Sequence, residues 1–233
     1  MWVVVPVKRF YNAKTRLAKI LSDAERESLA QVMLNDLLLA ISNCHLVSGI
    51  LVISTEIRAR YSVERLGGLF LEEKQAGLSA AVAQAGGWLS KHGQRGLMMI
   101  HGDVPLVRSA DLDHIIQSHD NELGVTIVPD IERDGTNALA VSPVDLIDFS
   151  FGKQSFSKHL SACKARGAPA KILESSGLSL DVDNVMDLQM LLSFDNETET
   201  LAYLADSGIA RRVLPRRDKS ADNVGVAAPS LLM

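Results

Sequence analysis

The chain of 233 residues has only two cysteines, few aromatic residues and no long hydrophobic run. Cys44 and Cys163 form no CxxC pair and belong to no cluster of metal ligands. A disulfide scaffold and a zinc ribbon are therefore excluded, and a reducing compartment is expected. The apolar runs 37–41 and 97–100 are far shorter than the roughly 20 residues that cross a bilayer. We therefore expect no membrane partner.

An excess of basic residues is also missing. The chain carries 24 Lys and Arg against 28 Asp and Glu, for a formal net charge of -4. It lacks the positive charge that binds a phosphate backbone, so we expect no nucleic-acid partner. Pro6 and Lys8 interrupt the apolar N-terminal run before a signal-peptide core develops, which predicts a cytoplasmic location.

Four common catalytic motifs are absent as well. The sequence contains no G-x-G-x-x-G after its first apolar run, no G-x-x-x-x-G-K-[ST], no G-x-S-x-G and no H-E-x-x-H. These absences weaken assignment as a dinucleotide-binding dehydrogenase, a P-loop NTPase, an α/β-hydrolase or a zinc metalloprotease.

The sequence does contain a regular alternation of two kinds of segment. Short apolar, β-branched runs, typical of buried strands, occur at 2–5, 49–53, 69–71, 97–100 and 125–128. Segments with helical spacing occur at 22–41, 56–66, 78–91, 110–118, 155–166, 185–192 and 197–205. In the first of these, Ser22 and Glu25 have the spacing of a capping box.

This alternation predicts a three-layer α/β fold in which a mostly parallel sheet carries helices on both faces. The length allows one large or two small domains. We expect a single domain over 1–215 and a flexible tail over 216–233, where no apolar period is found. Ligands of such open sheets bind beyond the carboxyl ends of the strands, so the residues that follow each strand are the first candidates for a site.

Cationic side chains follow the first predicted strand. Lys8, Lys14 and Arg16 lie in the runs 5–8 and 13–17, before the first predicted helix. Backbone N–H groups and cationic side chains in such a loop can bind a polyphosphate. The alternative is a solvated basic turn, but the position directly after a buried strand favours a triphosphate-binding loop.

Acidic residues follow later segments. Asp103 comes after the apolar run 97–100, and Asp181 and Asp183 would share a face if their segment is extended. Mg²⁺ in proteins takes one or two carboxylates and completes its shell with water and substrate phosphates. The alternatives are a turn or cap residue for Asp103 and a solvated pair for the other two. Together with the basic loop, the three favour a Mg²⁺ site.

A second region suits an anion. Gly135 and Gly152 permit close approach of the backbone, while Thr136, Asn137 and Ser155 offer short polar side chains. Ser155 stands at the predicted start of a helix, where unpaired N–H groups favour negative charge. The alternative is two turns and an N-cap serine.

Taken together, these segments resemble the 2-phospho-L-lactate guanylyltransferase family of coenzyme F420 biosynthesis. The match runs in the same order along most of residues 1–193. That family is a branch of the MobA-like nucleotidyltransferases, with a nucleotide-diphospho-sugar transferase-like fold, and it includes enzymes for phosphoenolpyruvate and 3-phospho-D-glycerate. The segments that carry the resemblance are 5–8, 13–17, 26–27, 33–36, 77–79, 103–106, 129–130, 134–139, 151–152, 155–156, 159–160, 180–183 and 187–188.

The resemblance implies a role for each candidate residue. The implied catalytic residues are Lys14, Arg16 and Asp103. The implied contacts of GTP are Pro6, Val7, Lys8, Lys14, Gly77, Leu78 and Ser79. The phosphorylated acid would bind Thr136, Asn137, Gly152 and Ser155, and Mg²⁺ would bind Asp103, Asp181 and Asp183. The chain departs from the family at Ser79, where Asn is usual, and in the run 101–104.

The implied activity is transfer of GMP from GTP to 2-phospho-L-lactate, phosphoenolpyruvate or 3-phospho-D-glycerate, with release of pyrophosphate. One alternative is another MobA-like enzyme that uses CTP or a molybdopterin, which should have a glycine-rich first loop; residues 5–17 contain no glycine. A second alternative is a sensor of GTP or of a phosphorylated acid without turnover. Whether the chain forms a homodimer, or passes its product to a downstream deazaflavin transferase, stays open.

Overall fold

The computed structural model describes residues 1–120 and 122–214, so the predicted tail over 216–233 lies outside the described residues. The described part contains a seven-stranded sheet with the order β3-β2-β1-β4-β6-β5-β7. Its strands are β1 (Trp2–Val7), β2 (Gly49–Ser54), β3 (Leu69–Glu72), β4 (Leu97–Ile100), β5 (Gly124–Pro129), β6 (Thr136–Ser142) and β7 (Ala170–Ile172). Only β6 runs antiparallel to its neighbours β4 and β5, so the sheet is mostly parallel, as predicted.

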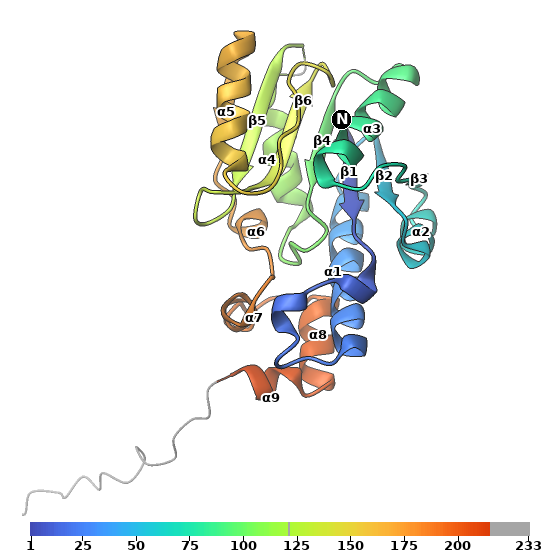
Figure 1. The fold of residues 1–233 in the computed structure, drawn as a ribbon, viewed down its shortest axis with the longest axis vertical. Coiled ribbons are helices and arrows are strands. Elements are labelled where there is room, and N and C mark those ends of the chain that lie inside the picture. The colour runs from blue at the N-terminus through green and yellow to red at the C-terminus, as the bar shows by residue number, and fades with distance from the viewer. Residues whose placement is uncertain (121, 215–233) are drawn as a thin grey trace, which may run out of the picture.

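Helices cover both faces of the sheet (Figure 1). The helices of the described residues are α1 (Asp23–Ser42), α2 (Ile57–Glu64), α3 (Leu78–Lys91), α4 (Ser109–Ser118), α5 (Ser155–Arg166), α6 (Ser176–Ser179), α7 (Val185–Leu191), α8 (Glu199–Asp206) and α9 (Ile209–Val213), with short 3-10 turns η1 (Phe10–Asn12) and η2 (Thr15–Leu17). Successive residues of β1 point alternately to the helix layers on the two faces of the sheet. Val3 and Val5 pack in one core cluster with α1, α2 and α4, whereas Val4 packs with α3 on the other face. Together with α5 over β5 and β6, this confirms the three-layer prediction.

A separate apolar cluster lies beyond the carboxyl ends of the strands. It joins η2, the first half of α1 and the helices α7, α8 and α9, which lie below the sheet in Figure 1. Leu188 and Leu204 are fully buried in it. Asp36 of α1 fixes the start of α8, because its carboxylate accepts hydrogen bonds from the N–H groups of Glu199 and Thr200 at 2.8 Å each. This packing carries residues 180–187 back toward the loop after β1.

The sequence did not predict β6 and β7. The segment of β6 reads TNALAVS and is buried along its whole length, so it shows neither a clear alternation nor a β-branched run. It is a strand because it inserts antiparallel between β4 and β5. The register is irregular between Val128 and Pro129, where Asn137 is an extra residue in β6.

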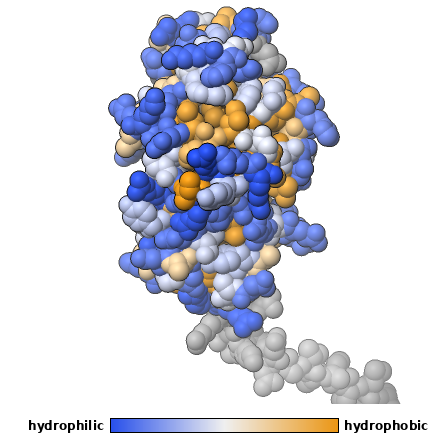
Figure 2. Space-filling view, turned by 90° about the vertical axis from the view of Figure 1, so that its right-hand side faces the viewer, coloured by the Kyte–Doolittle hydropathy of each residue, from blue (hydrophilic) through white to orange (hydrophobic). Residues whose placement is uncertain are grey.

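The side of the molecule formed by α2, α3 and β3 carries a group of apolar residues in its middle, with hydrophilic residues around them (Figure 2). β3 is the edge of the sheet on this side, and Leu69 on it is 41% exposed. In the described ranges, no helix combines the length and the apolar character needed to span a bilayer.

Candidate active site

A cavity of about 370 Å³ opens at the carboxyl ends of β1, β2 and β4. The end of β1, the loop after it, α1, the start of α3 and the segment after β4 all contribute to its lining. The residues that line it include Pro6, Val7, Lys8, Phe10, Lys14, Arg16, Leu34, Gly77, Leu78, His101, Asp103 and Asp183. The position matches the prediction for an open, mostly parallel sheet.

Lys14 joins two acidic segments at the rim of this cavity. Its Nζ lies 2.6 Å from Asp103 Oδ2 and 2.9 Å from Asp183 Oδ1, and its side chain is 6% exposed. Burial would lower the pKa of Lys14, but the two carboxylates outweigh this and hold the pKa above its ordinary value. The lysine backbone is in the left-handed region, with φ 54°, which is uncommon for a residue other than glycine. The loop thus accepts a strained residue where the ammonium must meet both carboxylates.

Asp103 has one carboxylate oxygen without a protein partner. Its Oδ2 accepts from Lys14, whereas its Oδ1 is buried and makes no hydrogen bond to any described residue. Burial would raise the pKa of Asp103, but the Lys14 ammonium, with a further contribution from His101, holds the pKa below its usual range. A buried, charged oxygen without a partner is costly, so Oδ1 is suited to a ligand that the protein does not itself supply.

The two other predicted carboxylates differ in their surroundings. Asp183 also meets Arg16 at 3.5 Å, and its backbone N–H donates to Asp187 at the start of α7. Asp181 accepts from Asn137 Nδ2 at 3.3 Å; burial, followed by the negative charges of Asp103 and Asp183, raises its pKa. Residues 180–183 belong to no strand of the sheet, and the shared face of Asp181 and Asp183 stays a prediction.

The donor set fits Mg²⁺ in chemistry but does not form a closed cage. Within residues 1–120 and 122–214, no group of three or more His, Cys, Asp or Glu side chains is placed to hold a metal ion by itself. Lys14 lies between Asp103 and Asp183 instead. Mg²⁺ commonly uses only one or two carboxylates together with water and phosphate oxygens, so the free Oδ1 of Asp103 is compatible with such a site.

The start of α3 forms the apolar end of the cavity. Gly77 has φ 122°, a conformation that side-chain-bearing residues rarely adopt, and it stands at the N-cap position directly before Leu78. Both line the cavity, but Ser79 does not. The Ser79 Oγ accepts a hydrogen bond from the Phe151 N–H at 2.9 Å and so links α3 to the segment before α5.

None of the residues predicted to bind the phosphorylated acid lines the cavity. Thr136, Asn137 and Ser155 are buried. Asn137 Nδ2 donates to the carbonyl groups of Leu178 and Ser179 as well as to Asp181. The Asn137 carbonyl accepts from the N–H of His101, a cavity residue, so the two regions are contiguous through β6 and the segment after β4.

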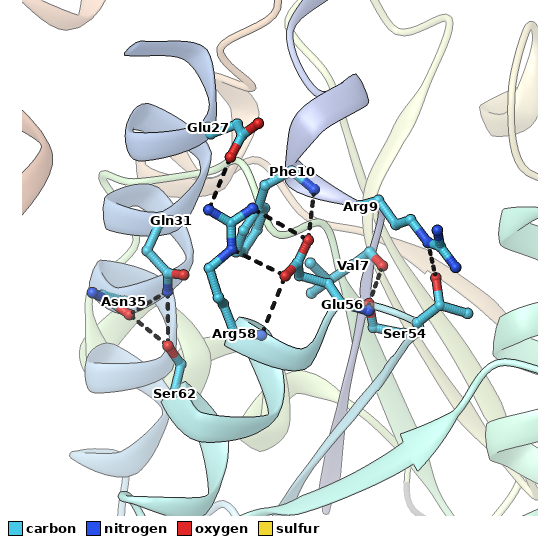
Figure 3. Close-up of polar contacts among 11 residues, drawn as sticks. Val7, Arg9, Phe10, Glu27, Gln31, Asn35, Ser54, Glu56, Arg58 and Ser62 are labelled. Carbon is cyan, nitrogen blue, oxygen red and sulfur yellow. Dashed lines mark hydrogen bonds and ion pairs between the residues drawn. The ribbon is translucent and has the colours of Figure 1, made fainter. Parts of the chain in front are cut away.

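A buried carboxylate ties the loop after β1 to the segment after β2 (Figure 3). Glu56 accepts from the Phe10 N–H at 3.1 Å and from Arg58 Nε at 3.0 Å, and the Arg58 guanidinium lies 4.9 Å from the centre of the Phe10 ring. Ser54 Oγ donates to the Val7 carbonyl at 2.6 Å. Burial would raise the pKa of Glu56, but Arg58 and the Phe10 N–H hold it below its usual range.

The structure thus brings together most of the predicted nucleotide residues and separates the others. Cavity-lining residues among the candidates are Pro6, Val7, Lys8, Lys14, Arg16, Gly77, Leu78, Asp103 and Asp183; the candidates outside the lining are Ser79, Thr136, Asn137, Gly152, Ser155 and Asp181. Sequence reasoning missed Glu56 and Arg58. The position of Glu56, directly after the second predicted strand, was the available signal.

Known proteins share this architecture and sequence. The sequence model of a family described as "Guanylyl transferase CofC like" matches residues 1–224. A phosphoenolpyruvate guanylyltransferase of Roseiflexus sp. (strain RS-1) is 33% identical over 195 residues, covering 84% of this chain and 86% of that protein. A 2-phospho-L-lactate guanylyltransferase of Methanothermobacter thermautotrophicus is 33% identical over 202 residues, covering 86% and 88%.

Among solved structures, a nucleotide-diphospho-sugar transferase from Desulfovibrio desulfuricans G20 superposes with a TM-score of 0.73 at 14% sequence identity, covering 91% of this chain and 96% of that one. The likeness confirms the predicted fold, while the family match extends over most of the chain. The chain therefore belongs to the CofC-like guanylyl transferases, a family of nucleotidyltransferases.

Proposed function

We propose that the protein transfers GMP from GTP to the phosphate of a small phosphorylated three-carbon acid, releases pyrophosphate, and acts in coenzyme F420 biosynthesis. The observation that carries the proposal is the meeting of Lys14 with Asp103 and Asp183 at the rim of a cavity that Lys8 and Arg16 also line. Cations and carboxylates at one place are what a reaction of a triphosphate requires. Relatives named for phosphoenolpyruvate and for 2-phospho-L-lactate support this class of acceptor.

The acceptor needs little activation. Its phosphate has a second pKa of about 6 and is an oxyanion at neutral pH, so no general base is required. The protein must hold this oxygen in line with the α-phosphorus of GTP and neutralise the leaving pyrophosphate. Lys8 and Arg16 are the groups proposed for the second task, because both line the cavity, and Lys14 is the proposed contact between the nucleotide and the acid.

The two substrates would occupy adjoining parts of the site. In this proposal the triphosphate lies along Pro6, Val7 and Lys8, and the guanine lies against Gly77 and Leu78, with Ser79 behind them. The acid takes the region of Thr136, Asn137, Gly152 and Ser155. The cavity, which Pro6, Val7, Lys8, Gly77 and Leu78 line, supports the proposed place of GTP. Of the residues proposed for the acid, Thr136, Asn137 and Ser155 are buried and Gly152 is exposed.

Asp103, through its unpaired Oδ1, and Asp183 are the residues that would hold Mg²⁺, with Asp181 beside them. When bound, the ion would stabilise negative charge on the phosphate oxygens. Lys14 keeps the two carboxylates together, and its ammonium offsets their mutual repulsion.

The test is a series of incubations of the purified protein with GTP, Mg²⁺ and one acid at a time: 2-phospho-L-lactate, phosphoenolpyruvate or 3-phospho-D-glycerate. We expect the mass of a GMP-phosphate anhydride with one of them, and pyrophosphate in equal amount. A parallel series with CTP tests the nearest enzymatic alternative. Tight GTP binding without pyrophosphate in any incubation would contradict the proposal and favour a sensor.

A further inference from the structure

His159 of α5 is a fully buried histidine with two hydrogen-bond partners. Its Nε2 lies 3.1 Å from the backbone nitrogen of Ser150, and its Nδ1 lies 3.1 Å from Thr136 Oγ1. Its ring also packs edge-on against Phe151 at 4.8 Å between centroids. The reaction proposed above has no general base, so it gives this histidine no role.

The partners determine the tautomer of this ring. A backbone N–H can only donate, so Nε2 must be the acceptor for Ser150. Burial, followed by the charge of Lys158, lowers the pKa of His159 to about 4, so the ring is neutral at physiological pH. In a neutral imidazole the other nitrogen carries the hydrogen, and Nδ1 therefore donates to Thr136 Oγ1.

This donation fixes the direction of the threonine hydroxyl. Thr136 Oγ1 accepts from His159, and it makes no other hydrogen bond to a described residue. Its own hydrogen is therefore unpaired within the part of the chain that the structure describes. A hydroxyl has one donor, and a donor is what an anionic oxygen of a ligand requires.

The β-bulge explains why Thr136 meets α5 at all. In regular alternation Thr136 would share a face with Ala138, which packs in the cluster under α1 and α4. The extra residue Asn137 places Thr136 opposite Pro129 instead, and its side chain contacts α5. Bulges next to active sites commonly redirect a side chain in this way.

We propose that His159 is a positioning residue, which acts through Thr136: its Nδ1–H holds the threonine oxygen so that the hydroxyl hydrogen is presented to a carboxylate or phosphate oxygen of the acceptor acid. The inference rests on the proposed function for the identity of the ligand. The tautomer itself rests on the contacts and the burial of His159 and not on the identity of the ligand.

The tautomer is tested in the unliganded wild-type protein. Long-range ¹H–¹⁵N correlation spectra of protein labelled at histidine nitrogens distinguish a protonated from an unprotonated ring nitrogen, and the spectrum of His159→Gln assigns the His159 signals. We expect a protonated Nδ1 and an unprotonated Nε2 near neutral pH. A protonated Nε2, or a doubly protonated ring, would overturn the proposal whatever the protein catalyses.

The action through Thr136 is tested by steady-state kinetics with whichever of the three acids supports turnover. His159→Gln should raise the KM for the acid about fivefold while changing the KM for GTP less than about twofold, as expected for loss of one oriented hydrogen bond. In a Thr136→Val background, His159→Gln should raise the KM for the acid less than about twofold further, because the two residues act as one unit. An equal effect in both backgrounds would overturn the proposal.

His119 supplies a matched control. It is also buried with a pKa lowered to about 4, and its ring nitrogens each lie 3.0 Å from a hydroxyl, Thr126 and Ser142. It sits at the opposite end of the β5–β6 pair from Thr136. His119→Gln should lower thermal stability and leave the KM for the acid unchanged. If no acid is turned over by the wild type, the proposed function fails, and the spectra still decide the state of His159.

Discussion

Lys14 is paired with two carboxylates that lie 89 and 169 residues away along the chain. A buried ion pair is weak grounds for expecting stability, because desolvation offsets the attraction between its charges. The strained backbone of Lys14 and the unpaired Oδ1 of Asp103 add to the cost. Such costs concentrated in one place are typical of a functional site.

Asp103→Asn should reduce kcat/KM for GMP transfer at least about 100-fold, a loss of the size seen when one charge-stabilising group is removed. The amide keeps the shape of the carboxylate but not its charge, while Lys14 retains Asp183. Asp148→Asn is the control, because that side chain is 96% exposed. Turnover near the wild-type value in Asp103→Asn, with Mg²⁺ present, would show that the charge of Asp103 is not needed.

The buried His119 should make the free energy of unfolding depend on pH. Burial lowers its pKa to about 4, below the value of 6.5 expected in the unfolded chain. The unfolded state therefore binds the proton first, so the stabilisation is complete above about pH 6.5 and is lost as the pH falls toward 4. Urea unfolding near pH 7 and near pH 5 measures how much the free energy of unfolding falls with acid, and this fall should be smaller in His119→Gln than in the wild type. The fall that persists in His119→Gln would come from His159, whose pKa is also lowered to about 4. An identical loss in both proteins would contradict a neutral buried His119.

At the scale of elements, the loop after β1 is held from behind by the segment after β2. Ser54 and Glu56 bind the Val7 carbonyl and the Phe10 N–H, and Arg9 donates to Thr55 at 3.0 Å. Val7 and Phe10 line the cavity, whereas Glu56 does not. Glu56 therefore acts on the cavity through the backbone of the loop.

Glu56→Gln should raise the KM for GTP about three- to tenfold, while the KM for the acid changes little, because the amide weakens the contacts to Arg58 and Phe10 that orient the loop. Glu64→Gln is the matched control in α2, where Glu64 forms only an exposed pair with Arg60. Steady-state kinetics with both substrates varied measures the split. An equal rise in both KM values would contradict an effect confined to the nucleotide loop, whereas a loss of folded protein would lower the apparent kcat and leave both KM values unchanged.

Some of these elements were predictable and others were not. The first helix was predictable, because Ser22 and Glu25 form the expected capping box. The helices α3 and α5 also have the predicted bounds. The loop after β1 followed from the buried strand before it. The position of Asp183 could not be predicted, because it depends on the packing of α7–α9 against α1. The direction of the Thr136 side chain could not be predicted either, because it depends on a bulge that no local sequence pattern marks.

At the scale of the whole molecule, two apolar regions must stay together for the site to exist. The sheet carries Lys14 and Asp103 on loops after β1 and β4, while the cluster around α7, α8 and α9 carries Asp183. α1 belongs to both regions, since Leu37 packs under the sheet and Leu29 packs in the lower cluster. We propose that residues 1–215 unfold as one domain for this reason.

Leu204→Ala in the lower cluster tests this single-domain proposal. Leu204 is fully buried, so the change should lower the free energy of unfolding by about 2–5 kcal/mol and move the whole transition to lower temperature. Leu39→Ala is the control, because Leu39 is 52% exposed and should cost less than about 0.5 kcal/mol. Differential scanning calorimetry that shows a second, separate transition in Leu204→Ala would divide the chain into two units.

The central claim is that the acceptor phosphate attacks the α-phosphorus of GTP in this site. GTP labelled with ³²P at the α-position or at the γ-position tests it directly, in separate reactions with Mg²⁺ and the acid. We predict that the α-label moves to the acid and the γ-label leaves in pyrophosphate, and that Asp103→Asn suppresses both. Transfer of the γ-label to the acid, or recovery of both labels in unreacted GTP with every acid, would contradict the account.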